Sequence, residues 1–242
     1  MATGAVSING PPSIGLWRLD LSEAPDAAEC ALLQPDEIER AKRLVFDRDR
    51  RRYLSAHVGL RQVLARHCGI DPGLLRIQPD ALGKPVLTGK GLPSFNLTHT
   101  GDLALVAIGQ AGVEVGVDAE MLRNVPDAEQ LVDELFAGPE ATVWRGLPPH
   151  LRSTAFLVGW TRKEAALKAV GCGLNLPPRE VHVGLDPVLV DVEVVHGLRR
   201  ATVSVTSQWL DTPAGPAAVA LAEWATWRVP AAPSPRRLRH PP

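Results

Sequence analysis

The sequence predicts an α+β fold in which the two halves of the chain repeat one unit, a long helix with short strands around it. Residues 36–68 and 150–170 carry apolar residues at helical spacings, and shorter apolar runs of the strand type flank both segments. The chain has 242 residues, of which 45% are hydrophobic and 22% are charged. This length and composition are typical of one large or two small globular domains with a core.

The first half is expected to contain, in order, a strand, a helical segment and two further strands, at 14–19, 36–68, 103–108 and 113–117. Asp36 and Glu37 suit the first turn of the helical segment, which ends at Gly69 and is long enough for one helix or two successive helices. A turn-rich stretch, 81–93, follows it. Only the turn at 109–112 separates the last two strands, and this pattern predicts a β-hairpin.

The second half is expected to contain two helices and three strands, at 127–136, 150–170, 188–195, 202–205 and 217–227. Gly171 and Gly173 end the longer helix. The last 13 residues hold five prolines and three arginines and almost no apolar side chains. We therefore expect an N-terminal half at 1–114, a C-terminal half at 115–229 and a disordered tail at 230–242.

Charge and cysteine content exclude several classes of protein. The formal net charge of −1 provides no general attraction for nucleic acid or for an anionic membrane. After residue 17 no charge-free stretch exceeds roughly 11 residues, whereas a membrane-spanning helix needs about 18. The first 17 residues lack the basic start of a signal peptide. Three cysteines without CxxC or CxxH spacing argue against a disulfide framework or a zinc site, so we expect a soluble cytoplasmic protein.

Two acidic residues alternate in the apolar run that follows Gly116. Asp118 and Glu120 lie two positions apart on the expected strand, so their side chains point to the same face, roughly 6 to 7 Å apart. Two such carboxylates repel each other unless a cation joins them, and hard oxygen ligands select Mg²⁺ or Mn²⁺. A DxE pattern is also common at a solvated strand edge, and this alternative stays open.

A second set of polar residues lies on the longer helix of the second half. Trp160, Glu164 and Lys168 are spaced four residues apart and share one helix face. Glu and Lys at this spacing commonly form an exposed pair of little energetic weight, which is one explanation. Phe156 and Leu157 make the neighbourhood apolar, however, and this favours a specific role for Glu164.

A third motif combines a hydroxyl, a histidine and a lysine. Thr98 and His99 lie just before an apolar strand, and Gly83 and Lys84 precede them. A hydroxyl, an imidazole and an ammonium can all donate hydrogen bonds to phosphate oxygens. A lone histidine is more often structural, and the sequence has no GxSxG motif to support a Ser/His/Asp triad.

A basic run begins the long helical segment of the first half. It contains seven cations: Arg40, Lys42, Arg43, Arg48, Arg50, Arg51 and Arg52. Most of these are expected on a solvated helix face, and the aromatic residues that a single-strand nucleic-acid binder interleaves with its cations are missing. One or two of them can hold a phosphate.

Four motifs in a fixed order resemble one enzyme family. They are GKP at 83–85, FNLTHTGD at 95–102, VGVDAE at 115–120 and WTRKEAALKAVGCGL at 160–174. Together they resemble the surfactin-synthetase type of 4′-phosphopantetheinyl transferase, and a fainter likeness extends to PDEIERAKRLVF at 35–46. The resemblance implies a monomeric pseudo-dimer of two similar α+β halves, with coenzyme A in the cleft between them. It also implies that Mg²⁺ assists transfer of phosphopantetheine from coenzyme A to a serine of an apo acyl or peptidyl carrier protein, leaving adenosine 3′,5′-bisphosphate.

The resemblance also implies roles for individual residues. The implied metal ligands are Asp118, Glu120 and Glu164. Phosphate and nucleotide contacts are implied for Lys168 at the pyrophosphate, Thr98 and His99 at phosphate oxygens, Gly83 and Lys84 at the adenosine, and Arg40 or Arg52 at the 3′-phosphate. Glu164 can also accept the proton of the incoming serine, and Lys168 can neutralise charge during transfer. Two positions depart from the family pattern, because His57 stands where many relatives carry Arg and Pro79 where some carry a basic residue.

Two other functions remain open at this point. A Mg²⁺-dependent hydrolase of nucleoside diphosphate derivatives would use the same charged groups, and an inactive homologue would only bind the carrier. For the transferase, the resemblance implies that the carrier docks along the second half, where we expect an apolar ridge at 171–185, formed by Cys172, Leu174, Leu176, Val181, Val183 and Leu185. Arg162 and Arg179 would flank this ridge. The alternative, that part of this segment is core, stays open.

Overall fold

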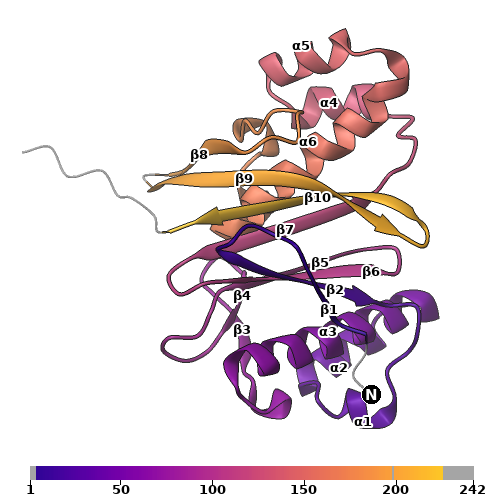
Figure 1. Cartoon of the computed structure of the whole chain (residues 1–242), viewed down its shortest axis with the longest axis vertical. Coiled ribbons are helices and arrows are strands. Elements are labelled where there is room, and N and C mark those ends of the chain that lie inside the picture. The colour runs from indigo at the N-terminus through magenta and orange to yellow at the C-terminus, as the bar shows by residue number, and fades with distance from the viewer. Residues whose placement is uncertain (1–3, 198, 226–242) are drawn as a thin grey trace, which may run out of the picture.

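The computed structural model describes residues 4–197 and 199–225 of the chain. Its main elements are two four-stranded antiparallel sheets, each with a long helix on its outer side (Figure 1). The strand orders are β1-β2-β6-β5 in the first sheet and β7-β10-β9-β8 in the second. The expected α+β fold with two similar halves is confirmed.

The strands of the first sheet are β1 (Val6–Ile8), β2 (Ile14–Asp20), β5 (Phe95–Thr100) and β6 (Leu103–Gly109). Those of the second sheet are β7 (Glu114–Met121), β8 (Val190–His196), β9 (Arg199–Thr212) and β10 (Gly215–Trp224). A separate two-stranded ribbon pairs β3 (Ile77–Pro79) with β4 (Pro85–Leu87). The first sheet therefore draws its strands from residues up to and including Gly109, and the second from Glu114 onward.

The α-helices are α1 (Ala27–Cys30), α2 (Pro35–Lys42), α3 (Asp47–Cys68), α4 (Ala128–Leu135), α5 (Gly138–Gly146) and α6 (Pro149–Val170). Short 3₁₀ turns occupy Pro72–Leu74, Gly173–Asn175 and Pro178–Glu180. The predicted segment 36–68 is thus two successive helices, α2 and α3. Both long helices, α3 and α6, have 22 residues and end at a glycine in the left-handed conformation, Gly69 with φ 67° and Gly171 with φ 76°.

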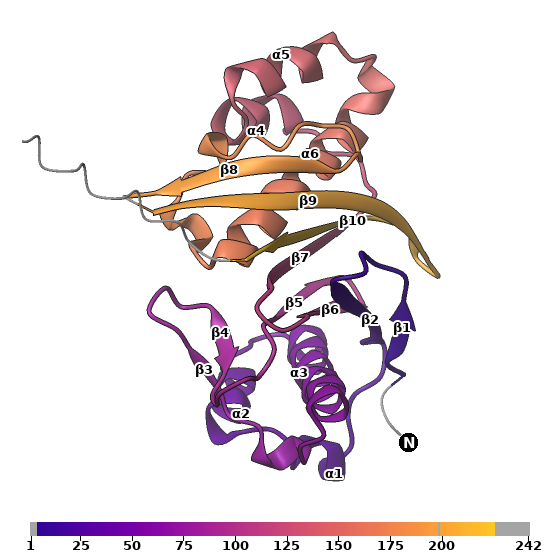
Figure 2. The same cartoon turned by 60° about the vertical axis from the view of Figure 1, so that its left-hand side comes forward.

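The molecule has four layers, α3, first sheet, second sheet and α6, which the view in Figure 2 shows from another side. Helix α3 packs on the outer face of the first sheet, where Leu60 contacts a cluster that includes Val106. Helix α6 packs in the same way on the second sheet. The inner faces of the two sheets form a third cluster, which includes Leu105 and Val117. Because both faces of β6 are covered, all of its residues are buried, and its sequence is a continuous apolar run.

The predicted hairpin at 103–117 is wrong, although both strands exist. Strand β6 pairs with β2 and β5, whereas β7 pairs with β10 of the other sheet. At the start of this turn a Cβ atom on Gly109 would lie 2.2 Å from the carbonyl oxygen of Val113, so the close turn requires glycine. The turn carries the chain from one sheet to the other, because both edges of β6 already have partners.

Within the described residues, no helix is long and apolar enough to span a bilayer. Cys30 and Cys68 are thiols that form no disulfide. The expected tail at 230–242 lies outside the described residues.

Candidate active site

Strand β7 lies directly against helix α6 because Gly116 has no side chain. A Cβ atom there would lie 2.1 Å from the carbonyl oxygen of Ala165 and 2.4 Å from the backbone nitrogen of Ala169. Both atoms belong to the backbone of α6, so only glycine permits this approach. Alternate residues of a strand share a face, and Asp118 and Glu120 therefore also point toward α6.

Helix α6 presents Lys168 to Asp118. The Nζ atom of Lys168 donates a hydrogen bond to Oδ1 of Asp118 at 2.6 Å, and Oγ1 of Thr98 on β5 donates to the same oxygen at 3.0 Å. Asp118 is 6% exposed. Burial raises the pKa of Asp118, while Lys168 and Thr98 oppose that rise. Residues from both halves of the chain thus meet in one cluster.

Two further carboxylates, Glu120 and Glu164, belong to the same electrostatic group. Burial raises the pKa of Glu120, and the charge of Asp118 raises it further. Burial also raises the pKa of Glu164; repulsion from Asp118 and Glu120 adds to this rise, and Lys168 opposes it. Mutual repulsion of three carboxylates in a partly buried site is relieved when a cation lies among them.

The residues fit a hard divalent cation in their chemistry, since Asp118, Glu120 and Glu164 offer only oxygen donors. Among residues 4–197 and 199–225, however, no group of three or more His, Cys, Asp or Glu side chains is assembled as a metal site. The ammonium of Lys168 instead pairs with Asp118, the most buried of the three carboxylates. A metal ion at this point would have to share Asp118 with Lys168.

Strand β5 joins the two halves through alternate side chains. Oδ1 of Asn96 accepts a hydrogen bond from the backbone nitrogen of Val117 at 2.9 Å, and Oγ1 of Thr100 accepts one from Met121 at 3.4 Å. Thr98 lies between them on the same face. His99 points the other way, and partial desolvation together with the cations Lys168 and Arg52 lowers its pKa. His99 is therefore neutral at physiological pH.

A cavity of about 510 Å³ opens on the His99 side of β5. Its walls come from α2, α3, the β3–β4 ribbon and β5. Arg40, His57 and His99 line it together with the carboxylates of Asp36 and Glu37, so basic and acidic groups share its wall. Because Thr98 precedes His99 and contacts Asp118, the cavity adjoins the carboxylate cluster.

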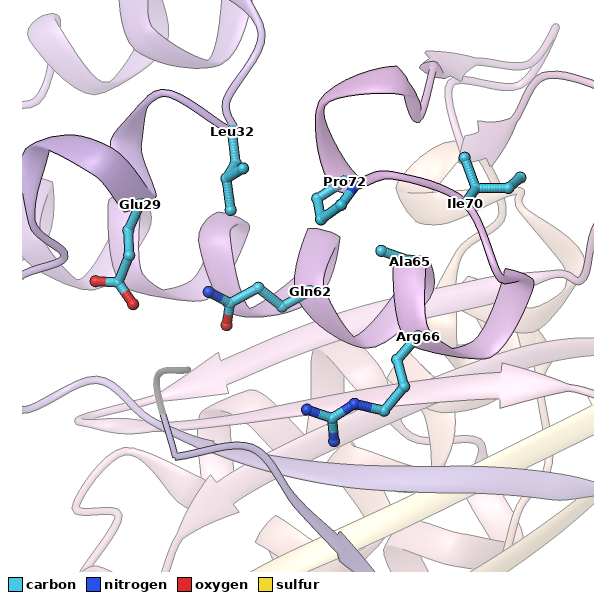
Figure 3. Close-up of a pocket in the computed structure, with 7 residues that line it drawn as sticks. All are labelled: Glu29, Leu32, Gln62, Ala65, Arg66, Ile70 and Pro72. Atoms are coloured by element: carbon cyan, nitrogen blue, oxygen red, sulfur yellow. The ribbon is translucent and has the colours of Figure 1, made fainter. Parts of the chain in front are cut away.

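A second cavity, of about 500 Å³, lies between α1 and α3 (Figure 3). Glu29, Gln62 and Arg66 provide its polar groups. Arg66 points from α3 toward the first sheet, and its guanidinium carbon lies 5.6 Å from the ring centroid of Trp17. No residue predicted for the site lines this cavity, so we place the candidate site at the first cavity.

Lys84 occupies a different place from the one implied for it. Its Nζ atom donates to Oε2 of Glu114 at 2.8 Å, to the carbonyl of Val115 at 3.1 Å and to that of Ala169 at 2.9 Å. These three bonds use all three protons of the ammonium. Burial also lowers the pKa of Lys84. The ammonium of Lys84 thus joins the two halves of the chain, whereas its neighbour Gly83 lines the cavity.

The two arginines considered for the 3′-phosphate are placed differently. Arg40 lines the cavity. Nε of Arg52 donates to Oδ1 of Asp102 at 2.8 Å, and Arg51 contacts the same oxygen at 2.9 Å. Arg52 is outside the cavity wall but close enough to His99 to lower its pKa. Arg40 is therefore the better placed of the two for a phosphate inside the cavity.

The apolar ridge expected at 171–185 is wrong for most of its residues. Cys172, Leu176, Val181 and Val183 are at most 4% exposed and belong to the core under α6. Arg162 is fully buried and donates two hydrogen bonds to the carbonyl of Val183. These four residues are apolar because they pack under α6, and buried side chains cannot form the expected docking ridge.

Sequence reasoning missed a buried ion pair beside the cavity. Glu37 of α2 and Arg61 of α3 are 8% and 0% exposed, and Nε of Arg61 donates to Oε2 of Glu37 at 2.8 Å. The sequence signal that could have indicated this pair is Arg61 itself, which lies on the apolar face of a helix. A buried cation requires an anionic partner.

Two family models match the chain in tandem. The model described as "4'-phosphopantetheinyl transferase, N-terminal" matches residues 17–110, and the model "4'-phosphopantetheinyl transferase superfamily" matches residues 114–217. The two matches meet where the chain passes from the first sheet to the second.

Several named proteins are similar to this chain. "4'-phosphopantetheinyl transferase HetI" of Nostoc sp. is 34% identical over 179 residues, which cover 72% of this chain and 75% of the relative. "Phosphopantetheinyl transferase" of Thraustochytrium sp. is 32% identical over 197 residues, which cover 73% and 67% of the two chains. The human "L-aminoadipate-semialdehyde dehydrogenase-phosphopantetheinyl transferase" is 28% identical over 199 residues, 76% of this chain, and the match spans only 62% of that relative. With similarity over most of its length and a matching model for each half, this chain belongs to the 4′-phosphopantetheinyl transferase superfamily.

Proposed function

We propose that this protein transfers the 4′-phosphopantetheine group of coenzyme A to a serine of an apo acyl or peptidyl carrier protein. The products are the holo-carrier and adenosine 3′,5′-bisphosphate. The observation that carries the proposal is the meeting of Thr98 from the first half with Asp118 and Lys168 from the second, beside a cavity that Arg40 and His99 line. Relatives named phosphopantetheinyl transferases support the same activity.

In the proposed reaction the serine oxygen attacks the coenzyme A phosphorus that carries the pantetheine arm. A new P–O bond forms to the serine, and the bond from this phosphorus to the bridging oxygen breaks, so the electron pair leaves with adenosine 3′,5′-bisphosphate. Phosphoryl transfer depends mainly on positioning and on neutralising the phosphate oxygens. Lys168 supplies a positive charge for this purpose, and His99 supplies a hydrogen-bond donor.

Glu164 is the proposed acceptor of the serine proton, directly or through a water molecule. Its pKa is raised by burial and by the neighbouring carboxylates, which makes it a better base than an exposed glutamate. Asp118, Glu120 and Glu164 would hold Mg²⁺ or Mn²⁺. Such an ion would neutralise charge on the pyrophosphate.

We also propose the surfactin-synthetase type, a monomeric state and a cytoplasmic location. Support for the monomer comes from the cluster itself, because Thr98 and Asp118 of one chain already meet and a second copy is not needed to join them. The thiols of Cys30 and Cys68, which form no disulfide, favour a reducing compartment.

Mass spectrometry of a panel of apo-carriers, incubated with the protein, coenzyme A and Mg²⁺, tests the proposal. A transferase adds the mass of phosphopantetheine to at least one carrier. Release of adenosine 3′,5′-bisphosphate without a carrier would instead identify a hydrolase. Carrier binding without any gain in mass would identify an inactive homologue, and both results would refute the proposed transfer.

A further inference from the structure

The β3–β4 ribbon forms one wall of the cavity that adjoins the carboxylate cluster. Residues from its two strands and from the turn between them line this cavity: Ile77, Gln78, Pro79, Gly83 and Pro85. Among the described residues, neither strand pairs with a strand of the two four-stranded sheets, and Figure 2 shows the ribbon reaching from the first half toward the second. A two-stranded ribbon alone is only marginally stable in water. The position of this wall therefore depends on what the ribbon contacts at each end.

The base of the ribbon is fixed to the first half. Leu87 of β4 is buried in the cluster between α3 and the first sheet, and Ile77 of β3 packs against the same cluster. Directly before β3, the carbonyl oxygen of Leu75 accepts a hydrogen bond from Nη1 of Arg61 at 3.1 Å. These contacts hold only the base, so the opposite end, the ribbon tip at 80–84, depends on other contacts.

Lys84 anchors the ribbon tip to the second half. Its ammonium donates to Glu114 and Val115 at the start of β7, and to the carbonyl oxygen of Ala169 in the last turn of α6. The last carbonyls of a helix lack partners within the helix, and a cation placed there also interacts favourably with the helix dipole. A Cβ atom on Gly171 would lie 3.4 Å from Cβ of Lys84, so the lysine stem itself lies against the end of α6.

Hydrogen bonds within the ribbon tip connect Lys84 to the cavity wall. Oδ1 of Asp80 accepts from the backbone nitrogens of Leu82 at 2.8 Å and Lys84 at 2.9 Å. The backbone nitrogen of Gly83 donates to the carbonyl oxygen of Asp80 at 3.0 Å. Leu82 packs against the core cluster under α6. Any movement of Lys84 away from α6 therefore also moves Gly83, which lines the cavity.

We propose that Lys84 is a positioning residue for coenzyme A binding, because its ammonium holds the ribbon tip against α6 and so fixes the ribbon as a wall of the cavity. The inference rests on the proposed function, since it assumes that coenzyme A occupies this cavity. Lys84 acts through the ribbon, because Glu114, Val115 and Ala169 already accept the three protons of its ammonium.

Helix α6 depends less on this anchor than the ribbon does. The backbone of β7 lies directly against α6, and Nε1 of Trp224 donates to the carbonyl oxygen of Ala169 at 2.8 Å. Loss of the Lys84 ammonium should therefore release the ribbon tip while Lys168 keeps its hydrogen bond to Asp118. Binding of coenzyme A and the chemical step should respond differently to this loss.

Lys84→Met, which keeps the apolar stem and removes the ammonium, tests the anchor. If the ribbon tip then stays docked in about a tenth of the molecules, the Kd for coenzyme A, measured by calorimetry without carrier, should rise about tenfold. The kcat of holo-carrier formation at saturating coenzyme A should stay within about threefold of the wild-type value, because the bound ligand returns the tip to its place. Lys90→Met, at an exposed lysine in the loop after β4, is the matched control and should change neither quantity.

Hydrogen–deuterium exchange reports the position of the ribbon directly. In Lys84→Met the backbone amides of 80–87 should exchange faster than in the wild type, whereas amides of β9 and β10 should not change. Saturating coenzyme A should restore the protection of 80–87, because the ligand and the docked tip stabilise each other.

Glu114→Gln distinguishes this anchor from a direct contact between Lys84 and coenzyme A. The variant removes the charge that pairs with Lys84 but keeps an oxygen that can accept from Ser94. A weaker anchor should raise the Kd for coenzyme A by about threefold, and Glu114→Gln should add no further loss to Lys84→Met. Because the ammonium and its two carbonyl partners remain, Glu114→Gln also decides the question if Lys84→Met does not fold.

Several results would overturn the proposal. An unchanged Kd in folded Lys84→Met would do so, and so would a raised Kd without faster exchange at 80–87, which would indicate a direct contact with the ligand. Faster exchange over the whole chain, or a kcat that falls as far as the Kd rises, would show that Lys84 supports the fold in general. A wild-type protein that does not bind coenzyme A would also refute it. If the wild type binds coenzyme A but forms no holo-carrier, the proposed function falls, while the Kd and exchange results still decide the role of Lys84.

Discussion

Replacing Gly116 with alanine tests the close approach of β7 and α6 on which the site depends. The added Cβ would lie 2.1 Å from the carbonyl oxygen of Ala165, whereas real contacts of a Cβ atom do not fall below 3.0 Å. The strand and the helix must therefore separate by about 0.9 Å, which is the difference between these two distances. Overpacking of this type costs about 1–3 kcal/mol. For a protein of this size the cost corresponds to a fall in Tm of roughly 2 to 12 °C.

The same movement should impair transfer more than it impairs stability. Asp118 lies two residues after Gly116 on the same strand face, and its 2.6 Å bond to Lys168 joins β7 to α6. A displacement of about 1 Å in a catalytic cluster can lower a rate by about 100-fold. We therefore expect Gly116→Ala to lower kcat by about this factor while the protein remains folded.

The matched control is Gly15→Ala on β2, where a Cβ atom would meet its nearest neighbour at 3.7 Å, an ordinary contact. This variant should retain wild-type Tm and kcat. Melting curves and initial rates of holo-carrier formation compare the two variants directly. Wild-type Tm and kcat in Gly116→Ala would show that β7 can move without cost, and would refute the argument that this glycine assembles the site.

Three further predictions follow from the site and from the ion pair beside it. Asp118→Ala or Glu164→Ala should abolish transfer without unfolding the protein. Glu120→Ala should reduce transfer less, because water can replace one ligand of an octahedral ion. Wild-type turnover of Asp118→Ala in Mg²⁺ would contradict the metal assignment. Arg40→Ala should raise the KM for coenzyme A by about tenfold and that for 3′-dephospho-coenzyme A much less, and equal increases would remove Arg40 from the 3′-phosphate. The pKa of Glu37 is lowered below its ordinary value of 4.5, so the ionised carboxylate should stabilise the fold fully above about pH 4.5 and progressively less as the pH falls through the lowered pKa. In melts between pH 3 and 6, the Tm of the wild type should fall more steeply with acid than the Tm of Glu37→Gln. Parallel curves would contradict the pKa shift.

Local signals predicted many of the helices and strands, because those signals act within a few residues. Gly69 and Gly171 adopt the left-handed conformation that ends a helix, and both long helices stop there. The alternation of Asp118 and Glu120 and the four-residue spacing of Glu164 and Lys168 likewise predict that the two side chains of each pair share one face. Such periodicity depends only on the geometry of one element.

Partners between distant elements could not be predicted in this way. The apolar run of β6 gave no indication whether β7 or β5 would pair with it, since a hydrogen-bonding edge does not identify its partner. Lys84 belonged to a motif associated with nucleotide binding, yet its ammonium is used by Glu114, Val115 and Ala169 between the halves. Only the assembled structure reveals such competition for one side chain.

The sequence by itself therefore determined the two-helix α+β plan, the family resemblance and the residues of the carboxylate cluster. The tertiary structure decided that Thr98 of one half contacts Asp118 of the other, and that Glu37 holds His57 at the wall of the cavity. It also decided that the apolar segment after α6 is core. The physical reason is that these contacts join residues far apart in the chain, and their hydrogen bonds and burial exist only after the two sheets and their helices have packed together.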